Sequence, residues 1–362
     1  MLAVLGFFLR RLAISIAILL VLTLATFAMF EKIPNEPAGF LVDLKHATPA
    51  QVRQARHKLG ADKPLPERYW LYVNRVAHGD FGKSWATIGF ASNGDELGTP
   101  VRTELWQALG VTASVVVGGV ALVLLLSFPL GVLSAARPGS ALDRTAVGVS
   151  LIGLSTHPLV VALLLQLFLG DRWQLLPGRG YCNLHGTPQI AYGTPGTVTT
   201  QTCGGVRDWA LHLLLPWVTF ALFFIALYSR VIRSRMMDVL GEPFIRTARA
   251  KGAPEWRVVR KHALPNALLP IVTMTAMDIG TALGVAAYVE TVFHLPGLGA
   301  RIVTSIASGL FDVPVVIGIV FFTAVIILTL NLVVDLLYAV LDPRVAAGRA
   351  ALGPAARSGR VA

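Results

Sequence analysis

The chain has 362 residues, of which 54% are hydrophobic and only 14% are charged. A soluble protein of this length has about 25% charged residues, so the composition excludes an ordinary soluble domain and indicates an integral membrane protein. We therefore interpret the formal net charge of +11 as a topology signal and not as a nucleic-acid-binding surface, and the two cysteines form no CxxC zinc or redox motif.

The N-terminal segment, residues 1–30, contains the first predicted transmembrane helix. Arg10 and Arg11 precede an uncharged apolar run at 12–30. The run lacks a small-residue cleavage site, so we interpret it as a retained span and not as a signal peptide.

Residues 31–110 are polar and predict a small extracytoplasmic domain. Two helices are expected there, one at 49–59 capped by Thr48 and one at 65–76. The apolar side of the second is expected to carry these aromatic and aliphatic residues: Tyr69, Trp70, Tyr72 and Val73. A Gly-Lys-Ser triplet at 82–84 superficially suggests a phosphate loop. Position 77 is Ala where such a loop needs Gly, which argues against nucleotide binding.

Residues 111–341 predict a five-helix core. The expected spans are 111–135, 146–169, 209–228, 270–293 and 313–340. An extracytoplasmic loop at 170–208 and a cytoplasmic loop at 230–266 interrupt them, and the Ala/Gly/Arg-rich tail at 342–362 is expected to be disordered. Together with the first span, this predicts an all-α integral membrane protein with six transmembrane helices.

The basic residues concentrate before the first span, in the loop between the second and third spans, in the 230–266 loop and in the tail. Because Lys and Arg in short loops favour the cytoplasmic side, both termini are predicted to be cytoplasmic. Cys182 and Cys203 then fall on the outside, where a disulfide is expected, stabilising its loop by roughly 3 kcal/mol. Two free thiols are the alternative.

The 230–266 loop predicts two short helices joined by an elbow. The first would run over 244–251 after Pro243 and end at Gly252, and the second would run over 255–263 after Pro254. On charge alone the loop could instead be a basic segment that touches anionic lipid, at about 1 kcal/mol per Lys or Arg.

The spacing in this loop resembles the coupling loop of permease subunits of bacterial ABC importers. Gly252, Leu264 and Pro265 are in register with that pattern, whereas Arg246 replaces its Glu and His262 its Ile. Ala248 matches its second Ala. With these departures the loop resembles the coupling loops of the dipeptide/oligopeptide branch of the family. Four further motifs also resemble that branch: LGADKPL at 59–65, GDFGKS at 79–84, VETVF with PGLG at 289–299, and LDPR at 341–344. The resemblance covers about 8–345.

The resemblance implies a type I ABC importer permease fold that forms half of a heterodimeric pathway for short peptides. It implies a second homologous permease subunit, two ATPase subunits, an extracytoplasmic substrate-binding protein and a peptide substrate as partners, within the lipid bilayer. ATP and magnesium would bind the ATPases, and no cofactor is expected on this chain. The implied ATPase-coupling residues are Phe244, Arg246, Thr247, Ala248, Lys251, Gly252, Leu264 and Pro265.

Polar residues inside the predicted spans are candidates for the translocation path or its gate. Asp278 is expected to form a polar stripe with Thr275 and Thr281, and its partner could be a peptide amino group or a basic group on the second permease. Glu290 is expected near an external gate, with Arg301 as one possible partner. His157, before Pro158, could line the path or satisfy the broken turn.

Three alternatives remain on the sequence. The same architecture could import glutathione, a nickel complex or a similar small solute, although the histidines show no metal-ligand spacing. An intramembrane protease is disfavoured because GxGD, HExxH and GxSxG are absent, and Asp278 and Asp335 lie toward opposite sides of the membrane. A proton-coupled transporter acting alone would not need the coupling loop.

Overall fold

The computed structural model describes residues 2–31, 48–58, 63–84, 89–90, 96–184, 189–192, 198–201, 205–307 and 312–341. The predicted tail at 342–362 lies outside them. The chain divides into two compact units, one formed by residues 1–106 together with 304–362 and the other by residues 107–303.

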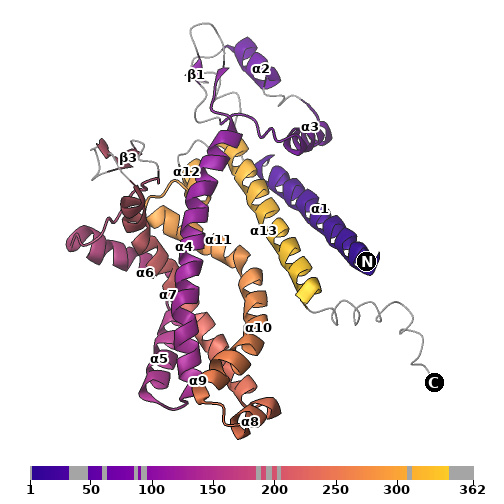
Figure 1. Cartoon of the computed structure of the whole chain (residues 1–362). Helices are drawn as coiled ribbons and strands as arrows, with labels where there is room; N and C mark the ends of the chain where they lie inside the picture. The colour runs from indigo at the N-terminus through magenta and orange to yellow at the C-terminus, as the bar shows by residue number, and fades with distance from the viewer. Residues whose placement is uncertain are drawn as a thin grey trace. The chain divides into compact units, whose positions relative to one another are not determined.

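The first unit is built on two long apolar helices, α1 (Leu2–Glu31) and α13 (Val313–Leu341), which pack along each other (Figure 1). Two shorter helices, α2 (Pro49–Lys58) and α3 (Leu65–Ala77), precede a two-residue strand pair. In this pair β1 (Gly89–Phe90) runs antiparallel to β2 (Glu96–Leu97).

The second unit is organised around α4 (Val101–Ala136, which begins in the first unit) and α7 (Gly205–Leu240). The remaining elements up to α7 are α5 (Ala141–Ser155), α6 (Pro158–Leu165), the π-helix η3 (Gln166–Arg172), β3 (Gln189–Tyr192) and β4 (Val198–Gln201). After α7 come α8 (Pro243–Ala250), α9 (Glu255–Arg257), the π-helix η4 (Val258–Ala263), α10 (Leu264–Met277), α11 (Ile279–Val292) and α12 (Leu298–Ala307), the last of which ends in the first unit.

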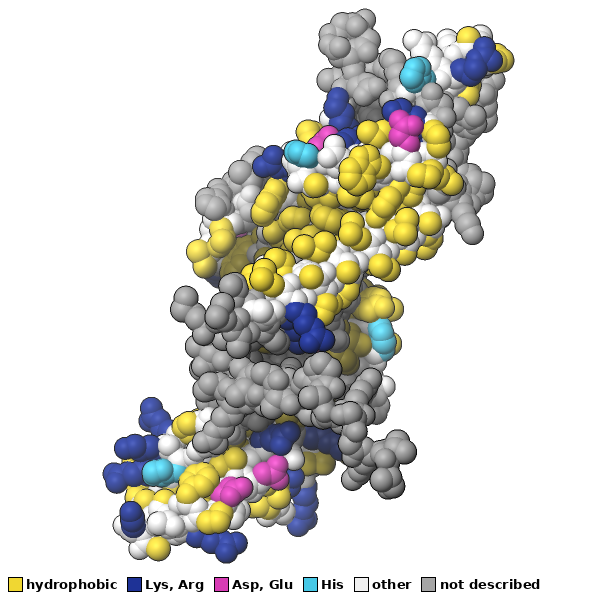
Figure 2. Space-filling model, turned by 90° about the vertical axis from the view of Figure 1, so that its right-hand side faces the viewer, with side chains coloured by type: hydrophobic (Ala, Val, Ile, Leu, Met, Phe, Trp, Pro, Cys, Tyr) yellow, Lys and Arg dark blue, Asp and Glu magenta, His cyan; other side chains and the backbone are white. Residues whose placement is uncertain are grey.

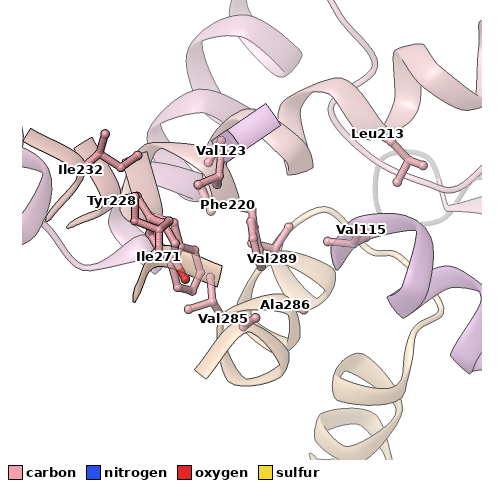
Figure 3. Close-up of a cluster of buried hydrophobic side chains, with 14 of the residues drawn as sticks. Val115, Val123, Leu213, Phe220, Tyr228, Ile232, Ile271, Val285, Ala286 and Val289 are labelled. Carbon is pink, nitrogen blue, oxygen red and sulfur yellow. The ribbon is translucent and has the colours of Figure 1, made fainter. Parts of the chain in front are cut away.

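One continuous cluster of buried side chains holds the second unit together. Side chains from α4, α7, α10 and α11 converge in it, with Phe220 and Tyr228 of α7 at its centre (Figure 3). The same cluster extends through Ile232 and Met236 to Ile245 on α8. The short helix α8 is therefore part of the core packing of this unit.

Among the described residues, four helices are long and apolar enough to cross a membrane: Phe8–Met29, Val101–Ala136, Gly205–Leu240 and Val313–Val334. The other two predicted spans are interrupted. The 146–169 segment is divided among α5, α6 and η3, because Pro158 cannot continue the hydrogen-bond ladder of α5. The 270–293 segment is divided at Asp278 into α10 and α11.

The predicted all-α class is correct for the long elements but misses two short strand pairs. β3 pairs antiparallel with β4, from Gln189 opposite Gln201 to Tyr192 opposite Val198. Both strand pairs lie in polar connections where the sequence shows no long alternating pattern, so only tertiary context distinguishes them from loops.

The two helices predicted within 31–110 are confirmed. Thr48 caps α2, because its hydroxyl accepts a hydrogen bond from the Gln51 N–H at 3.4 Å. On the apolar side of α3, Tyr69 and Tyr72 are partly buried, whereas Trp70 is 68% exposed.

Glycines on α4 allow α7 to approach closely. A Cβ atom on Gly118 would lie 2.2 Å from the ring of Trp217, and one on Gly131 would lie 2.6 Å from the Ile232 side chain and 2.9 Å from the Ser229 carbonyl oxygen. Small residues are favoured at such contacts because lipid tails offer no hydrophobic driving force and helices associate through close packing.

We predict that Gly131→Val destabilises the protein by about 1–3 kcal/mol, because its Cβ meets backbone that cannot move aside. Thermal unfolding of the purified protein in detergent measures the effect. The matched control is Gly148→Val on α5, where a Cβ atom meets nothing within 4 Å. Equal melting temperatures for the two variants would contradict the close α4–α7 contact.

Candidate functional site

The short helix α8 has clear start and stop signals. Glu242 has an extended backbone (φ −67°, ψ 149°) and precedes Pro243, whose missing N–H is not needed in the first helical turn. The helix ends before Gly252, whose φ of +79° lies in the left-handed region that glycine adopts without a Cβ penalty. The Gly252 N–H donates to the Arg249 carbonyl at 2.9 Å. The helix predicted over 244–251 is therefore confirmed.

The elbow after α8 is fixed by one backbone hydrogen bond and one ion pair. The Ala253 N–H donates to the Ala248 carbonyl at 3.2 Å. The Arg249 guanidinium makes two hydrogen bonds to the Glu255 carboxylate, at 2.7 and 3.2 Å. Both side chains are exposed, so this pair orients α9 against α8 more than it stabilises the fold.

The predicted second helix at 255–263 is present but has a different form. It begins as α9 and continues as the π-helix η4, which runs directly into α10. Leu264 and Pro265 accordingly form the start of α10 and not the end of a loop. Pro265 is accepted there because it sits in the first turn.

The coupling residues inferred from the resemblance separate into an inward and an outward set. Ile245, which the sequence analysis did not include, is fully buried, and Ala248 and Leu264 are partly buried against the same core. The exposed set comprises Phe244, Arg246, Thr247, Lys251, Gly252 and Pro265. In Figure 2, Lys and Arg side chains gather at the lower end of the molecule, where Figure 1 places α8 and α9.

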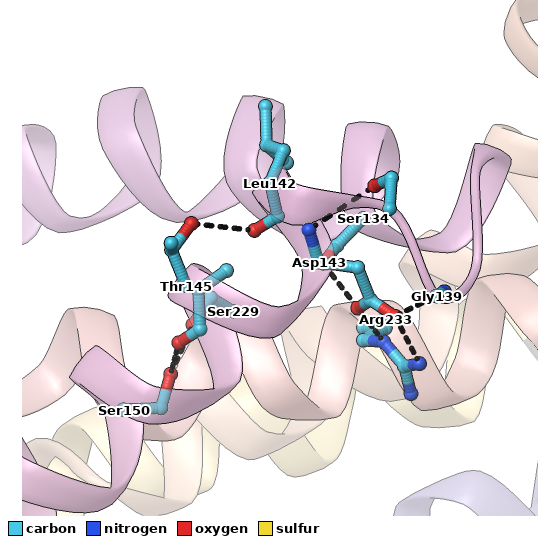
Figure 4. Close-up of polar contacts among 10 residues, drawn as sticks. Ser134, Gly139, Leu142, Asp143, Thr145, Ser150, Ser229 and Arg233 are labelled. Atoms are coloured by element: carbon cyan, nitrogen blue, oxygen red, sulfur yellow. Dashed lines mark hydrogen bonds and ion pairs between the residues drawn. The ribbon is translucent and has the colours of Figure 1, made fainter.

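A partly buried ion pair joins α7 to the α4–α5 turn, ten residues before α8 begins. The Arg233 guanidinium donates to the two carboxylate oxygens of Asp143 at 2.6 and 2.9 Å (Figure 4). The same carboxylate accepts hydrogen bonds from the Ser134 hydroxyl at 2.7 Å and from the Gly139 N–H at 2.8 Å. The Arg233 guanidinium, aided by these two donors, holds the pKa of Asp143 well below its usual range.

The uncovered face of α11 is polar or small. Thr281, Gly284, Tyr288 and Thr291 recur at spacings of three, four and three residues, and all are exposed. A membrane helix that faced only lipid would carry apolar side chains there. Thr281 was expected on the path, whereas Tyr288 was not, although its position seven residues after Thr281 could have revealed it.

His157 satisfies the break between α5 and α6. Its Nδ1 accepts a hydrogen bond from the Leu159 N–H at 3.2 Å, and its backbone carbonyl accepts from the Val160 N–H at 3.0 Å. The imidazole also meets the Tyr288 ring edge-to-face, with centroids 5.2 Å apart. The structural alternative for His157 thus has a geometric basis, and the same side chain adjoins the exposed face of α11.

Asp278 lies at the junction of α10 and α11 and faces α7. Its carboxylate accepts a hydrogen bond from the Tyr228 hydroxyl at 3.0 Å. Thr275 is partly buried and donates back to the Ile271 carbonyl, whereas Thr281 is exposed. The three residues predicted as one stripe therefore do not share one continuous helix face, because the helix is interrupted at its middle member. A role for Asp278 on the path stays a prediction.

Glu290 is completely buried and holds the turn between α11 and α12. Its carboxylate accepts hydrogen bonds from the Thr112 hydroxyl at 2.6 Å and from the Gly299 and Ala300 N–H groups at 2.8 and 3.2 Å. Thr112 in turn accepts from the Leu298 N–H at 2.9 Å. Within the described residues these hydrogen bonds, and not an ion pair with Arg301, satisfy the carboxylate.

The PGLG sequence makes this arrangement possible. A Cβ atom on Gly297 would lie 2.2 Å from Cδ of Glu290, and one on Gly299 would lie 2.2 Å from Cβ of Ala287. Both glycines therefore bring the turn into contact with α11. Thr112 could not be found from the sequence, because it lies 178 positions from Glu290.

Cys182 is buried, and its Sγ lies 3.6 Å from Nε2 of His212. Cys203 lies outside the described residues, so the expected Cys182–Cys203 disulfide stays a prediction. The side chain of Asp335 likewise lies outside the described set.

Two family models match the chain. "Binding-protein-dependent transport system inner membrane component" covers residues 127–347, and "Binding-prot-dependent transport system membrane comp, N-term" covers residues 4–99. The chain belongs to this family of transport-system inner membrane components. It is thus a membrane transport subunit and not an enzyme.

Individual relatives of this membrane component extend over nearly its whole length. The dipeptide transport system permease protein DppB of Escherichia coli K12 is 34% identical over 346 residues, covering 94% of this chain and 98% of the relative. The probable D,D-dipeptide transport system permease protein DdpB of the same strain is 37% identical over 327 residues, covering 89% and 92%. The di/tripeptide transport system permease protein DppB of Pseudomonas aeruginosa is 32% identical over 349 residues, covering 94% and 98%.

We predict that Asp143→Asn lowers the melting temperature of this membrane component in detergent. The folded pKa of Asp143 is depressed, so its contribution is present above the unfolded pKa of about 4 and is lost only as the pH falls through the lower folded value. The difference from the unsubstituted protein should therefore be constant between about pH 6 and about pH 8.

The control for Asp143→Asn is Asp238→Asn, which removes the exposed ion pair between Asp238 and Arg235, whose charged groups lie 4.0 Å apart. This substitution should change the melting temperature little. An equal loss for both variants, or a difference that changes across the neutral range, would contradict the assigned role of the buried pair.

We predict that neither cysteine of the unreduced, denatured protein reacts with an alkylating reagent and that both react after reduction. The expected disulfide removes both thiols, and denaturation exposes the buried Cys182 in either case. Mass spectrometry of the peptides gives the result. Alkylation of the Cys203 peptide without reductant would disprove the bridge.

Proposed function

We propose that the chain is one of two permease subunits of an ATP-driven importer of short peptides, and that α8 couples it to separate ATPase subunits. The relatives named as dipeptide or di/tripeptide permeases support the cargo class, and no contact in the described residues favours glutathione or a nickel complex instead. The proposed partners are a second homologous permease, two ATPases that bind ATP and magnesium, and an extracytoplasmic substrate-binding protein.

The arrangement of α8 is the observation that carries the coupling role. Its inward residue Ile245 is anchored in the core, while Phe244 stays 44% exposed on a helix of eight residues. Aromatic residues and arginine are enriched at protein interfaces relative to the rest of the surface. An ATPase surface that receives α8 would bury Phe244 and the exposed basic residues around it.

The long helix α7 connects α8 rigidly to the membrane-spanning part of the subunit. α7 is a single helix of 36 residues, about 54 Å long, and Gly241 and Glu242 alone separate it from α8. The Asp143–Arg233 pair ties α7 to the α4–α5 turn. A force on α8 would therefore act on α4, α5 and α7 together, which is the requirement for a lever and not for a flexible loop.

The proposed topology has six spans with both termini in the cytoplasm. Four are the long apolar helices, and two are the interrupted segments at 146–169 and 270–293. Interrupted helices occur at membrane depth where they line a cavity or a protein interface, because the broken ladder needs polar partners. This topology places α8 and α9 on the cytoplasmic side.

The proposed solute path runs along the exposed face of α11. Thr281, Tyr288 and the adjoining His157 offer hydrogen-bonding groups to a peptide, and Gly284 leaves open space beside them. The second permease would close the other side of this path. Asp278 and Glu290 act behind the face, as anchors of the helix junction and of the α11–α12 turn.

The coupling proposal predicts that Gly252→Glu abolishes peptide uptake while the assembled complex still hydrolyses ATP. The side chain forces strain on the left-handed residue that ends α8, of roughly 1–2 kcal/mol, and adds a negative charge beside the docking surface. Uptake and ATPase activity are measured on the reconstituted importer with its binding protein.

The matched control is Gly79→Glu at the end of α3. Gly79 has a φ of +75°, and its N–H donates to the Val76 carbonyl at 2.9 Å, which is the same capping geometry on a different helix. Uptake should survive in Gly79→Glu. Phe244→Ala provides a milder second variant that leaves the core intact; normal uptake in both Gly252→Glu and Phe244→Ala would refute docking through α8.

A further inference from the structure

The helix α3 packs on the transmembrane helix α1 at residues that lie well inside the apolar span. The Tyr69 hydroxyl donates to the Leu20 carbonyl at 3.0 Å and lies 3.0 Å from the Thr23 hydroxyl. The ring of Tyr72 stacks on Phe27, with centroids 6.3 Å apart. Leu20, Thr23 and Phe27 all belong to the candidate span Phe8–Met29.

These contacts limit how far α3 can stand from the bilayer. Leu20 is nine residues before the end of the span at Met29, or about 14 Å along the helix axis. A tyrosine on α3 that reaches this level cannot belong to a helix standing clear of the membrane in water. The contacts therefore place α3 where the hydrocarbon meets the headgroups, at the end of α1 remote from the N-terminus (Figure 1).

The two flanks of α3 differ in the way that such a position requires. One flank is apolar and is formed by Pro66, Trp70, Val73 and Ala77. The other carries charges and is formed by Glu67, Leu71 and Arg75. Trp70 is 68% exposed, although tryptophan is the residue that most favours the membrane interface.

We propose that α3 is an interfacial helix whose Trp70 flank inserts into the lipid leaflet at the C-terminal end of α1. The occupant of this flank is lipid because the flank continues an exposed apolar surface of α1, a helix long and apolar enough to span a membrane. Val21 and Leu24, on the turns of α1 next to the α3 contacts, are 67% and 51% exposed, and Figure 2 shows the broad hydrophobic surface on the α1 side. The proposal requires that α1 spans the membrane and is independent of the cargo and of coupling.

Cysteine accessibility tests the two flanks directly. Trp70→Cys and Leu71→Cys are made in the full chain, reconstituted in phosphatidylcholine vesicles and treated with a membrane-impermeant maleimide, with the unsubstituted chain as the background for Cys182 and Cys203. Exposure from the protein alone ranks position 70 (68%) above position 71 (38%). Insertion in lipid reverses this order.

The expected result is that Leu71→Cys reacts about tenfold faster than Trp70→Cys in vesicles. Equal rates, or faster labelling at position 70, would overturn the proposal. Both positions lie on the same side of the membrane, so the ratio does not depend on the orientation of the protein in the vesicles.

A second measurement avoids the loss of the aromatic ring. The fluorescence of Trp70 is obtained by subtracting the spectrum of Trp70→Phe from that of the unsubstituted protein, and that of Trp256, which is 63% exposed on α9, is obtained in the same way. Brominated phosphatidylcholine should quench the Trp70 signal and spare the Trp256 signal. A Trp70 signal that resists brominated lipid, or that changes only when the extracytoplasmic binding protein is added, would show that Trp70 contacts water or that protein and not lipid.

Discussion

The bilayer core offers no hydrogen bonds, so backbone groups freed where a membrane helix breaks need partners within the protein. The structure meets this constraint at each irregular point. The carboxylate of Glu290 accepts three hydrogen bonds, His157 caps the break between α5 and α6, and Tyr228 donates to Asp278 at the α10–α11 junction. These partners meet at the positions where the helices break, and they hold the two interrupted segments in place beside the long regular helices.

A second consequence concerns stiffness. Polar anchors and glycine-mediated contacts join α4, α5, α7 and α11 into one packed unit, while α8 is attached to it by a buried isoleucine. Because Ile245 is packed in the core, a displacement of α8 would also displace the helices beneath it. A flexible loop without such a buried residue could move without displacing them. The physical basis of the proposed coupling is therefore the packing beneath α8 as much as the residues on its surface.

Local signals in the sequence predicted the elements that depend on local chemistry. Thr48 before α2, Pro243 before α8 and Gly252 after it were all identified because caps and breakers act within a few residues. The membrane class followed from composition alone. The junction at Asp278 was not predicted, because the sequence has no proline or other strong helix breaker at that position.

The parts of the site that required the structure are those made by distant residues. Thr112 meets Glu290, Asp143 meets Arg233, and Tyr228 meets Asp278 across 178, 90 and 50 positions. The sequence places Trp70 on the apolar side of α3 together with Tyr69, Tyr72 and Val73. Hydropathy does not tell a side chain that faces protein from one that faces lipid, and only the contacts of Tyr69 and Tyr72 separated the two.

The hydrogen bonds of Glu290 restrict the way in which the α11–α12 corner of the second unit can move. They join α4 and the start of α12 to a single side chain of α11, and the two glycines leave no slack between them. If the PGLG turn moved alone, the buried Glu290 carboxylate would lose its hydrogen bonds from the Gly299 and Ala300 N–H groups. That loss costs more free energy than a movement of the turn together with α11. The residues of α4, α11 and the start of α12 that meet at Glu290 therefore keep their contacts best if they move together.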